Sequence, residues 1–125
     1  MREIKFRGQD FETGEWLYGS YNGVNAGAAD VFIIYEREIF DPVSFGFIGT
    51  EIVEKEVKEE TVGQYTGLKD KNGVEIYESD RCAISSYLTS EVRYLEFASA
   101  WYVGNRRLTK KLASKIEVIG NKYEN

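Results

Sequence analysis

Short apolar segments separated by polar turns fill most of this chain, and they predict strands rather than long helices. Apolar and charged residues alternate in residues 2–7, the pattern of a half-buried strand, and we expect Gly8 to end it. Residues 10–15 are polar and resemble a turn, and residues 16–21 are again rich in apolar side chains. These segments predict a first hairpin.

The next part of the chain combines one clear strand with less decided segments. Residues 31–35 form a continuous apolar run, which is typical of a core strand. Further strand material is expected at residues 39–40 and 43–48, on both sides of Pro42. Pro42 itself is expected at the start of a strand or on an edge strand. Residues 51–60 fit a short helix or an edge strand equally well, and residues 22–30 are expected to form a loop.

The second half repeats the alternation of short strands and turns. Strands are predicted at residues 61–68, 74–77, 81–87, 90–97, 100–103 and 116–119. Asn72-Gly73 supplies the positive φ angles of a two-residue hairpin turn, and residues 78–80 predict another turn. Leu108 and Leu112 have the spacing of one helical turn. The pattern therefore predicts a mainly β fold of short antiparallel strands with little helix, as a small barrel or sandwich.

Composition adds limits to this picture. The 125 residues match one domain, or two very small subdomains, and nine Tyr, seven Phe and two Trp favour strands. Cys82 is the single cysteine, so no intrachain disulfide can form. The chain has no apolar run near 18 residues and no apolar signal segment at its start, so we expect no membrane contact and a cytoplasmic location.

Histidine is absent from the chain, and this excludes several kinds of site. Histidine is the usual proton carrier near neutral pH and the commonest metal ligand. Without it, no Ser-His-Asp or Cys-His arrangement exists, and one cysteine cannot hold a structural zinc ion. An enzyme would depend on carboxylate, Lys or Tyr side chains. We therefore expect a protein without cofactor or metal.

Charge is distributed unevenly along the chain. Residues 1–100 hold 10 Lys and Arg against 19 Asp and Glu, whereas residues 101–125 hold 6 against 2. This asymmetry permits attraction between the two parts, between neighbouring copies, or between the basic part and a polyanion.

The basic cluster is the first candidate site. It consists of Arg106, Arg107, Lys110, Lys111 and Lys115. Trp101 and Tyr102 precede it, and cations beside aromatic rings are what a nucleic-acid site uses for phosphates and bases. The alternative is a solvated helical turn, which the acidic balance of the whole chain favours.

Three other candidates have simpler structural interpretations. Asp70 begins a stretch that resembles a calcium loop, but Gly73 comes too early for that pattern, and a hairpin turn accounts for it better. The carboxylates of Glu75, Glu78 and Asp80 could serve catalysis, although turn chemistry explains them as well. Cys82 lies in a predicted strand and is expected to be a buried apolar residue.

Three blocks of this sequence carry a family resemblance. The middle block runs from Val62 to Asp80 and contains Gly-Gln-Tyr-Thr-Gly-Leu-Lys-Asp-Lys-Asn-Gly. The others are Met1 to Gly8 with Gly14 to Gly19, and Ile116 to Asn125. In this order the blocks resemble the YopX family of small phage and prophage proteins. Family members carry Gly-Asp where this chain has Ser79 and Asp80, which suggests that positive φ is not required at Ser79.

The resemblance implies a mainly β phage or prophage protein with an SH3-like barrel in its C-terminal half. We take residues 1–125 as one YopX-like domain, with a possible N-terminal β subdomain at residues 1–60 and the small barrel at residues 62–123. No catalytic residue, cofactor or ligand comes with the resemblance.

The sequence is compatible with three functions. The first is a non-enzymatic accessory protein in the host cytoplasm that binds itself, as a homo-oligomer, or a phage or host protein. The second is a small-barrel module that binds nucleic acid through the basic cluster. The third is a carboxylate-based enzyme acting on a small ligand.

Overall fold

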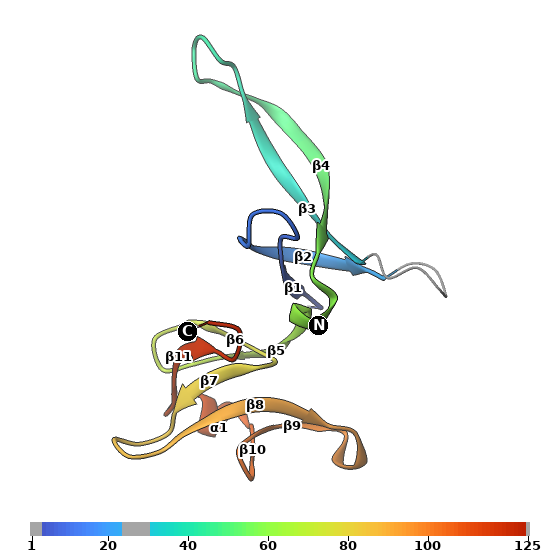
Figure 1. The fold of residues 1–125 in the computed structure, drawn as a ribbon. Coiled ribbons are helices and arrows are strands. Elements are labelled where there is room, and N and C mark those ends of the chain that lie inside the picture. The colour runs from blue at the N-terminus through green and yellow to red at the C-terminus, as the bar shows by residue number, and fades with distance from the viewer. Residues whose placement is uncertain (1–3, 24–30, 125) are drawn as a thin grey trace. The chain divides into compact units, whose positions relative to one another are not determined.

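The computed structural model describes residues 4–23 and 31–124 and is mainly β (Figure 1). The chain divides into two compact units. The N-terminal unit is Lys5–Val62, and the C-terminal unit is Gly63–Asn125 together with Met1–Ile4. The loop predicted at residues 22–30 falls mostly outside the described residues. No helix in the described ranges is long and apolar enough to cross a membrane.

The N-terminal unit begins with the predicted hairpin of β1 (Phe6–Gln9) and β2 (Trp16–Asn22). The expected end of the first strand at Gly8 is wrong, because Gly8 pairs with Leu17 inside the hairpin. A glycine is required there by packing: a Cβ at Gly8 would lie 2.8 Å from Cγ2 of Val57. The strand therefore continues past a residue that local propensity alone marks as a breaker.

The second hairpin joins β3 (Val31–Phe40) and β4 (Phe47–Val57), and η1 (Glu59–Thr61) follows it. The undecided segment at residues 51–60 is thus strand as far as Val57. Only the start of β3 pairs with β2, through Ser20↔Ile34 to Asn22↔Phe32. The remainder of β3 and β4 forms a two-stranded ribbon that extends beyond β1 and β2 (Figure 1).

The turn of this ribbon corrects the strand expected at residues 43–48. Pro42, Val43 and Ser44 lie in a turn, so Pro42 is neither a strand start nor an edge residue. The Asp41 carboxylate accepts hydrogen bonds from the backbone N–H groups of Val43 (2.7 Å) and Ser44 (2.8 Å). This side-chain turn satisfies backbone donors that a strand would have used, and it overrides the apolar pattern.

The core of the N-terminal unit is small. Its buried side chains are Leu17, Val31, Ile33 and Val57, with Phe6, Tyr35 and Val62 packed around them.

The C-terminal unit contains seven strands and two short helices among the described residues. The strands are β5 (Gly63–Lys69), β6 (Glu75–Tyr77), β7 (Asp80–Ala83), β8 (Thr89–Leu95), β9 (Ala100–Val103), β10 (Arg106–Arg107) and β11 (Glu117–Asn121). The helices are η2 (Glu96–Ala98) and α1 (Lys110–Ala113). The predicted strands are all present, although the one expected to reach residue 87 ends at Ala83. Leu108 lies before the helix rather than in it.

The described strands of this unit pair as the β5–β6 hairpin and a sheet with the order β10-β9-β8-β7-β11. This pairing is no closed barrel, so the SH3-like detail is not confirmed, whereas the mainly β class is. The core side chains are Ile76, Cys82, Val92, Trp101, Val103, Leu108, Ala113 and Ile116.

Asp70 organises the turn between β5 and β6. Its carboxylate accepts hydrogen bonds from the N–H groups of Asn72 (2.8 Å) and Val74 (2.9 Å), and from Val118 of β11 (2.8 Å). The expected two-residue turn is wrong in detail, because only Gly73 has positive φ (80°). The side chain thus closes a longer loop and ties it to a strand 48 residues away.

The turn after β6 contains a second correction. Ser79 has φ of 74°, so positive φ is present there although the residue is not glycine. The Ser79 N–H donates to the carbonyl of Val92 (2.8 Å), and its carbonyl accepts from the N–H of Lys122 (3.0 Å). These two long-range bonds hold the backbone in a conformation that the side chain disfavours.

Candidate interaction surfaces

The structure brings the basic cluster together at the surface of the C-terminal unit. Arg106 and Arg107 form β10, Lys110 and Lys111 begin α1, and Lys115 follows that helix. Thr109 caps the helix, since its hydroxyl accepts a hydrogen bond from the N–H of Leu112 (3.1 Å). All five cations are exposed and make no ion pair with the described part of the chain.

Of the two aromatic residues expected beside this cluster, Tyr102 pairs with Arg107 across β9 and β10 and is partly exposed, whereas Trp101 does not face the cluster. Trp101 is buried in the core and packs edge-on against Tyr94, with 5.1 Å between ring centroids. Tyr94, which pairs with Trp101 in the sheet, is 43% exposed. The position of Trp101 in the chain predicts a ring beside the cluster, whereas β9 turns this side chain into the core.

The carboxylates of Glu75, Glu78 and Asp80 do not form one group. Asp80 is buried and its carboxylate accepts a hydrogen bond from the N–H of Tyr77 (2.7 Å). Glu75 accepts one from the hydroxyl of Tyr77 (3.1 Å). No cluster of three or more potential metal ligands exists among residues 4–23 and 31–124.

Asp70 and Cys82 are both structural. Burial raises the pKa of Asp70, but the hydrogen bonds from Val118, Val74 and Asn72 outweigh it, so this pKa lies below its ordinary value. Cys82 is fully buried in the core. Burial, followed by the charges of Asp80 and Asp70, raises the pKa of its thiol to about 12. The thiol is therefore protonated at neutral pH and is a poor nucleophile.

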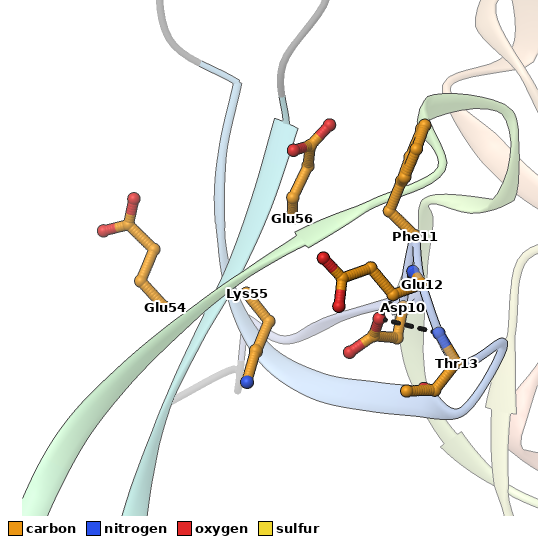
Figure 2. Close-up of a pocket in the computed structure, with 7 residues that line it drawn as sticks. All are labelled: Asp10, Phe11, Glu12, Thr13, Glu54, Lys55 and Glu56. Carbon is orange, nitrogen blue, oxygen red and sulfur yellow. Dashed lines mark hydrogen bonds between the residues drawn. The ribbon is translucent and has the colours of Figure 1, made fainter.

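A small acidic pocket lies in the N-terminal unit. It holds about 170 Å³ and is lined by Asp10, Phe11, Glu12, Thr13, Glu54, Lys55 and Glu56 (Figure 2). The Asp10 carboxylate accepts hydrogen bonds from the N–H groups of Thr13 (3.1 Å) and Glu12 (2.8 Å), which lower its pKa. The Asp10 carboxylate therefore stabilises the turn at residues 10–13. The pocket is smaller than the ~300 Å³ at which ligand sites begin.

The ribbon of β3 and β4 ends in an apolar surface that we call the hairpin tip. It consists of Phe40 (49% exposed), Val43 (85%), Phe45 (78%), Phe47 (60%) and Ile48 (64%). The rings of Phe40 and Phe47 pack edge to face, 6.0 Å apart. Apolar residues around a proline turn, where polar residues are the rule, are the sequence signal that could have revealed this surface.

The C-terminal unit contains a surface hollow that we call the aromatic groove. One part, about 370 Å³, is lined by Thr66, Gly67, Leu68, Ser99, Ala100, Trp101, Arg107 and Leu108. An adjoining part, about 270 Å³, shares Ser99 and Trp101 and adds Ile4, Gln64 and Tyr94. Arg107 links the groove to the basic cluster, and α1 packs beside β5, which supplies one wall.

Comparison with known proteins places the chain in a family. The family model described as YopX protein matches residues 5–125. The crystal structure of protein EF1440 from Enterococcus faecalis is similar, with a TM-score of 0.53 and 24% sequence identity over 97% of this chain and 94% of that one. At this identity the likeness shows the fold alone. No protein with a curated description matches the chain. Because the family model spans nearly every residue, the chain belongs to the YopX family, whose function is unknown.

Proposed function

We propose that this protein acts by binding a protein surface through the hairpin tip, without catalysis. The hairpin tip carries the proposal. Five apolar residues, three of them Phe, are exposed at the end of a two-stranded ribbon with no packed layer over it in the described part of the unit. Contiguous exposed apolar side chains of this kind mark interaction sites, and aromatic residues are enriched there.

The partner in this proposal is another copy of the chain or a phage or host protein in the host cytoplasm. A two-stranded ribbon is marginally stable by itself. A partner that covers the tip also stabilises the ribbon, because apolar burial is the main favourable contribution to association.

Affinity capture with matched variants tests this proposal. The bait is the tagged protein, with or without nuclease treatment, and the comparison bait is Phe45→Ser with Phe47→Ser. We expect a nuclease-resistant protein partner that the double variant loses. Tyr87→Ser is the control, because Tyr87 is also aromatic and almost fully exposed but lies in the loop between β7 and β8. Equal recovery with the tip variant contradicts the proposal.

Nucleic-acid binding is the second candidate, and the five exposed cations, with Tyr102 paired to Arg107, favour it. The expected binding weakens steeply with salt, because counterions are released from the phosphates. A mobility shift at low salt should disappear in the variant Arg106→Glu, Arg107→Glu, Lys110→Glu and Lys111→Glu. The control is Lys55→Glu with Lys58→Glu, which reverses charges in the same way but in the N-terminal unit. No shift by the wild-type protein at low salt rejects this candidate.

A further inference from the structure

We propose that the hairpin tip of one copy docks into the aromatic groove of a second copy, so that copies join head to tail. This inference rests on the proposed function, because it names the partner of the same hairpin tip. It depends on three features: the area of the tip, the form of the groove, and the charges beside each.

The tip offers enough apolar area for a specific interface. An aromatic side chain buries roughly 150–250 Å². Scaled by the exposed fractions of Phe40, Phe45 and Phe47, this gives about 280–470 Å² per tip, to which Val43 and Ile48 add. A stable interface buries about 800 Å² on each partner. The tip therefore supplies a large part of that area, and the adjoining part of the ribbon has to supply the rest.

The groove offers a concave surface of suitable size and chemistry. Its larger part, about 370 Å³, has the volume of a small-ligand site but is open to solvent, so it can receive a protruding side chain from outside. Leu68, Trp101 and Leu108 give it an apolar floor, and Gly67 leaves one wall without a side chain. Ile4 and Tyr94 are exposed in the adjoining part. An aromatic ring such as that of Phe45 would meet Leu68, Trp101 and Leu108 on this floor, with the polar residues Thr66, Ser99 and Arg107 at its edges.

The charges beside the two surfaces are opposite. The ribbon behind the tip carries Glu36, Glu38, Glu51, Glu54 and Glu56 against Arg37 and Lys55, and Arg37 is already paired with Glu51. The groove is lined by Arg107, and the other cations of the basic cluster follow or adjoin Arg107 in the chain, on β10, on α1 and just after α1. The asymmetry extends to the units: residues 5–62 hold 5 Lys and Arg against 12 Asp and Glu, and the rest of the chain holds 11 against 9.

These charges select the partner. Two tips that met end to end would bring two acidic ribbons together, and like charges across an interface are unfavourable. An acidic ribbon also repels a nucleic acid or an anionic membrane. A second copy's groove satisfies both the apolar tip and its acidic surroundings. Because tip and groove are different surfaces, the contact is heterologous, and it produces a closed ring or an open filament.

Mixing two defective variants gives the decisive test. The tip variant is Phe45→Ser with Phe47→Ser, and the groove variant is Ile4→Asp with Arg107→Glu, all at exposed positions. Light scattering after size exclusion should show wild-type mass rising with concentration and each variant alone as a monomer. The 1:1 mixture should give a dimer and nothing larger, because it restores one tip–groove contact. Tyr87→Ser should assemble like the wild type.

Several outcomes overturn the inference. A groove variant that still forms dimers alone indicates tip-to-tip contact, and a mixture that stays monomeric excludes tip–groove contact. Wild-type protein that is monomeric at high micromolar concentration also overturns it, while tip-dependent capture of another protein would leave the proposed function standing. Assembly that survives the tip substitutions also overturns the inference, and equal capture of partners by the tip variant contradicts the proposed function as well. Circular dichroism of each variant establishes that it is folded.

Engineered cysteines provide a second measurement. Oxidation of a mixture of Val43→Cys and Gln64→Cys proteins should give a disulfide between unlike copies. A disulfide between two Val43→Cys chains, without the unlike pair, contradicts the proposal. The native Cys82 does not interfere, because it is fully buried.

Discussion

Replacing Asp70 with asparagine should destabilise the C-terminal unit strongly. The side chain is buried and its two oxygens accept three backbone hydrogen bonds, two within its own turn and one from Val118 on β11. An asparagine can keep the pair from Asn72 and Val74 with its one oxygen. Its amide group then faces the N–H of Val118, so that a donor meets a donor.

The magnitude follows from these bonds. A hydrogen bond to a charged group contributes about 1.5–3 kcal/mol, and an unsatisfied buried N–H costs about 1–3 kcal/mol. The substitution removes the hydrogen bond from Val118, and it removes the acceptor's negative charge from the hydrogen bonds of Asn72 and Val74. Together these losses should lower the free energy of unfolding by about 2–4 kcal/mol. For a unit of this size that corresponds to roughly 10–25 °C in Tm.

Urea and thermal unfolding measure this change. Asp41→Asn is the matched control, because Asp41 closes the exposed turn of the ribbon with one oxygen, which asparagine retains. We expect a much smaller effect there. An Asp70→Asn protein that unfolds within ~0.5 kcal/mol of the wild type, the scatter of ordinary surface substitutions, would refute the role assigned to Asp70.

The pH dependence of the same comparison has a definite sign. The pKa of Asp70 is lower in the folded protein than its ordinary value, so the folded state favours the charged carboxylate. This contribution is fully present above the unfolded pKa of about 3.9 and is lost as the pH falls through the lower folded pKa. The difference in stability between wild type and Asp70→Asn should therefore be constant near pH 7 and shrink below about pH 4.

Three further predictions concern single positions. Ser79→Gly should raise the free energy of unfolding by up to about 1 kcal/mol, because relief of ~1–2 kcal/mol of left-handed backbone strain exceeds the cost of the more flexible unfolded chain. A lower Tm in thermal unfolding contradicts this. Gly8→Ala should lower stability by about 1–3 kcal/mol, because its Cβ would overlap Val57; unchanged urea unfolding contradicts the close packing. The Cys82 thiol, whose pKa is raised to about 12, should react with a thiol reagent at pH 8 only after unfolding, and rapid reaction of the native protein contradicts its burial.

Local chemistry made much of the fold predictable. The first hairpin, the turn at residues 71–73 and the strand at Ala100–Val103 all follow from apolar runs bounded by turn residues. Such signals act within a few residues, so they can be recognised without any knowledge of the partners. The family blocks add the family assignment, which the match over residues 5–125 confirms.

The candidate sites were less predictable, because exposure depends on residues far away in the sequence. Trp101 and Tyr102 are adjacent, yet only packing against the core decides that Trp101 is buried and Tyr102 partly exposed. The hairpin tip was missed for the same reason: its Phe residues resemble core residues until the strand pairing shows that nothing in the described part of the unit covers them.

The sequence by itself determined the mainly β class, the positions of most strands, the basic cluster and the absence of histidine chemistry. These are properties of composition and of neighbours in the chain. Only the tertiary structure decided the role of Asp70, whose bond to Val118 spans 48 residues, and the positive φ of Ser79, which bonds to Val92 and Lys122 impose. The physical reason is that hydrogen bonds and packing between distant residues outweigh local preferences of a kcal/mol or two, and no pattern in the chain reports them.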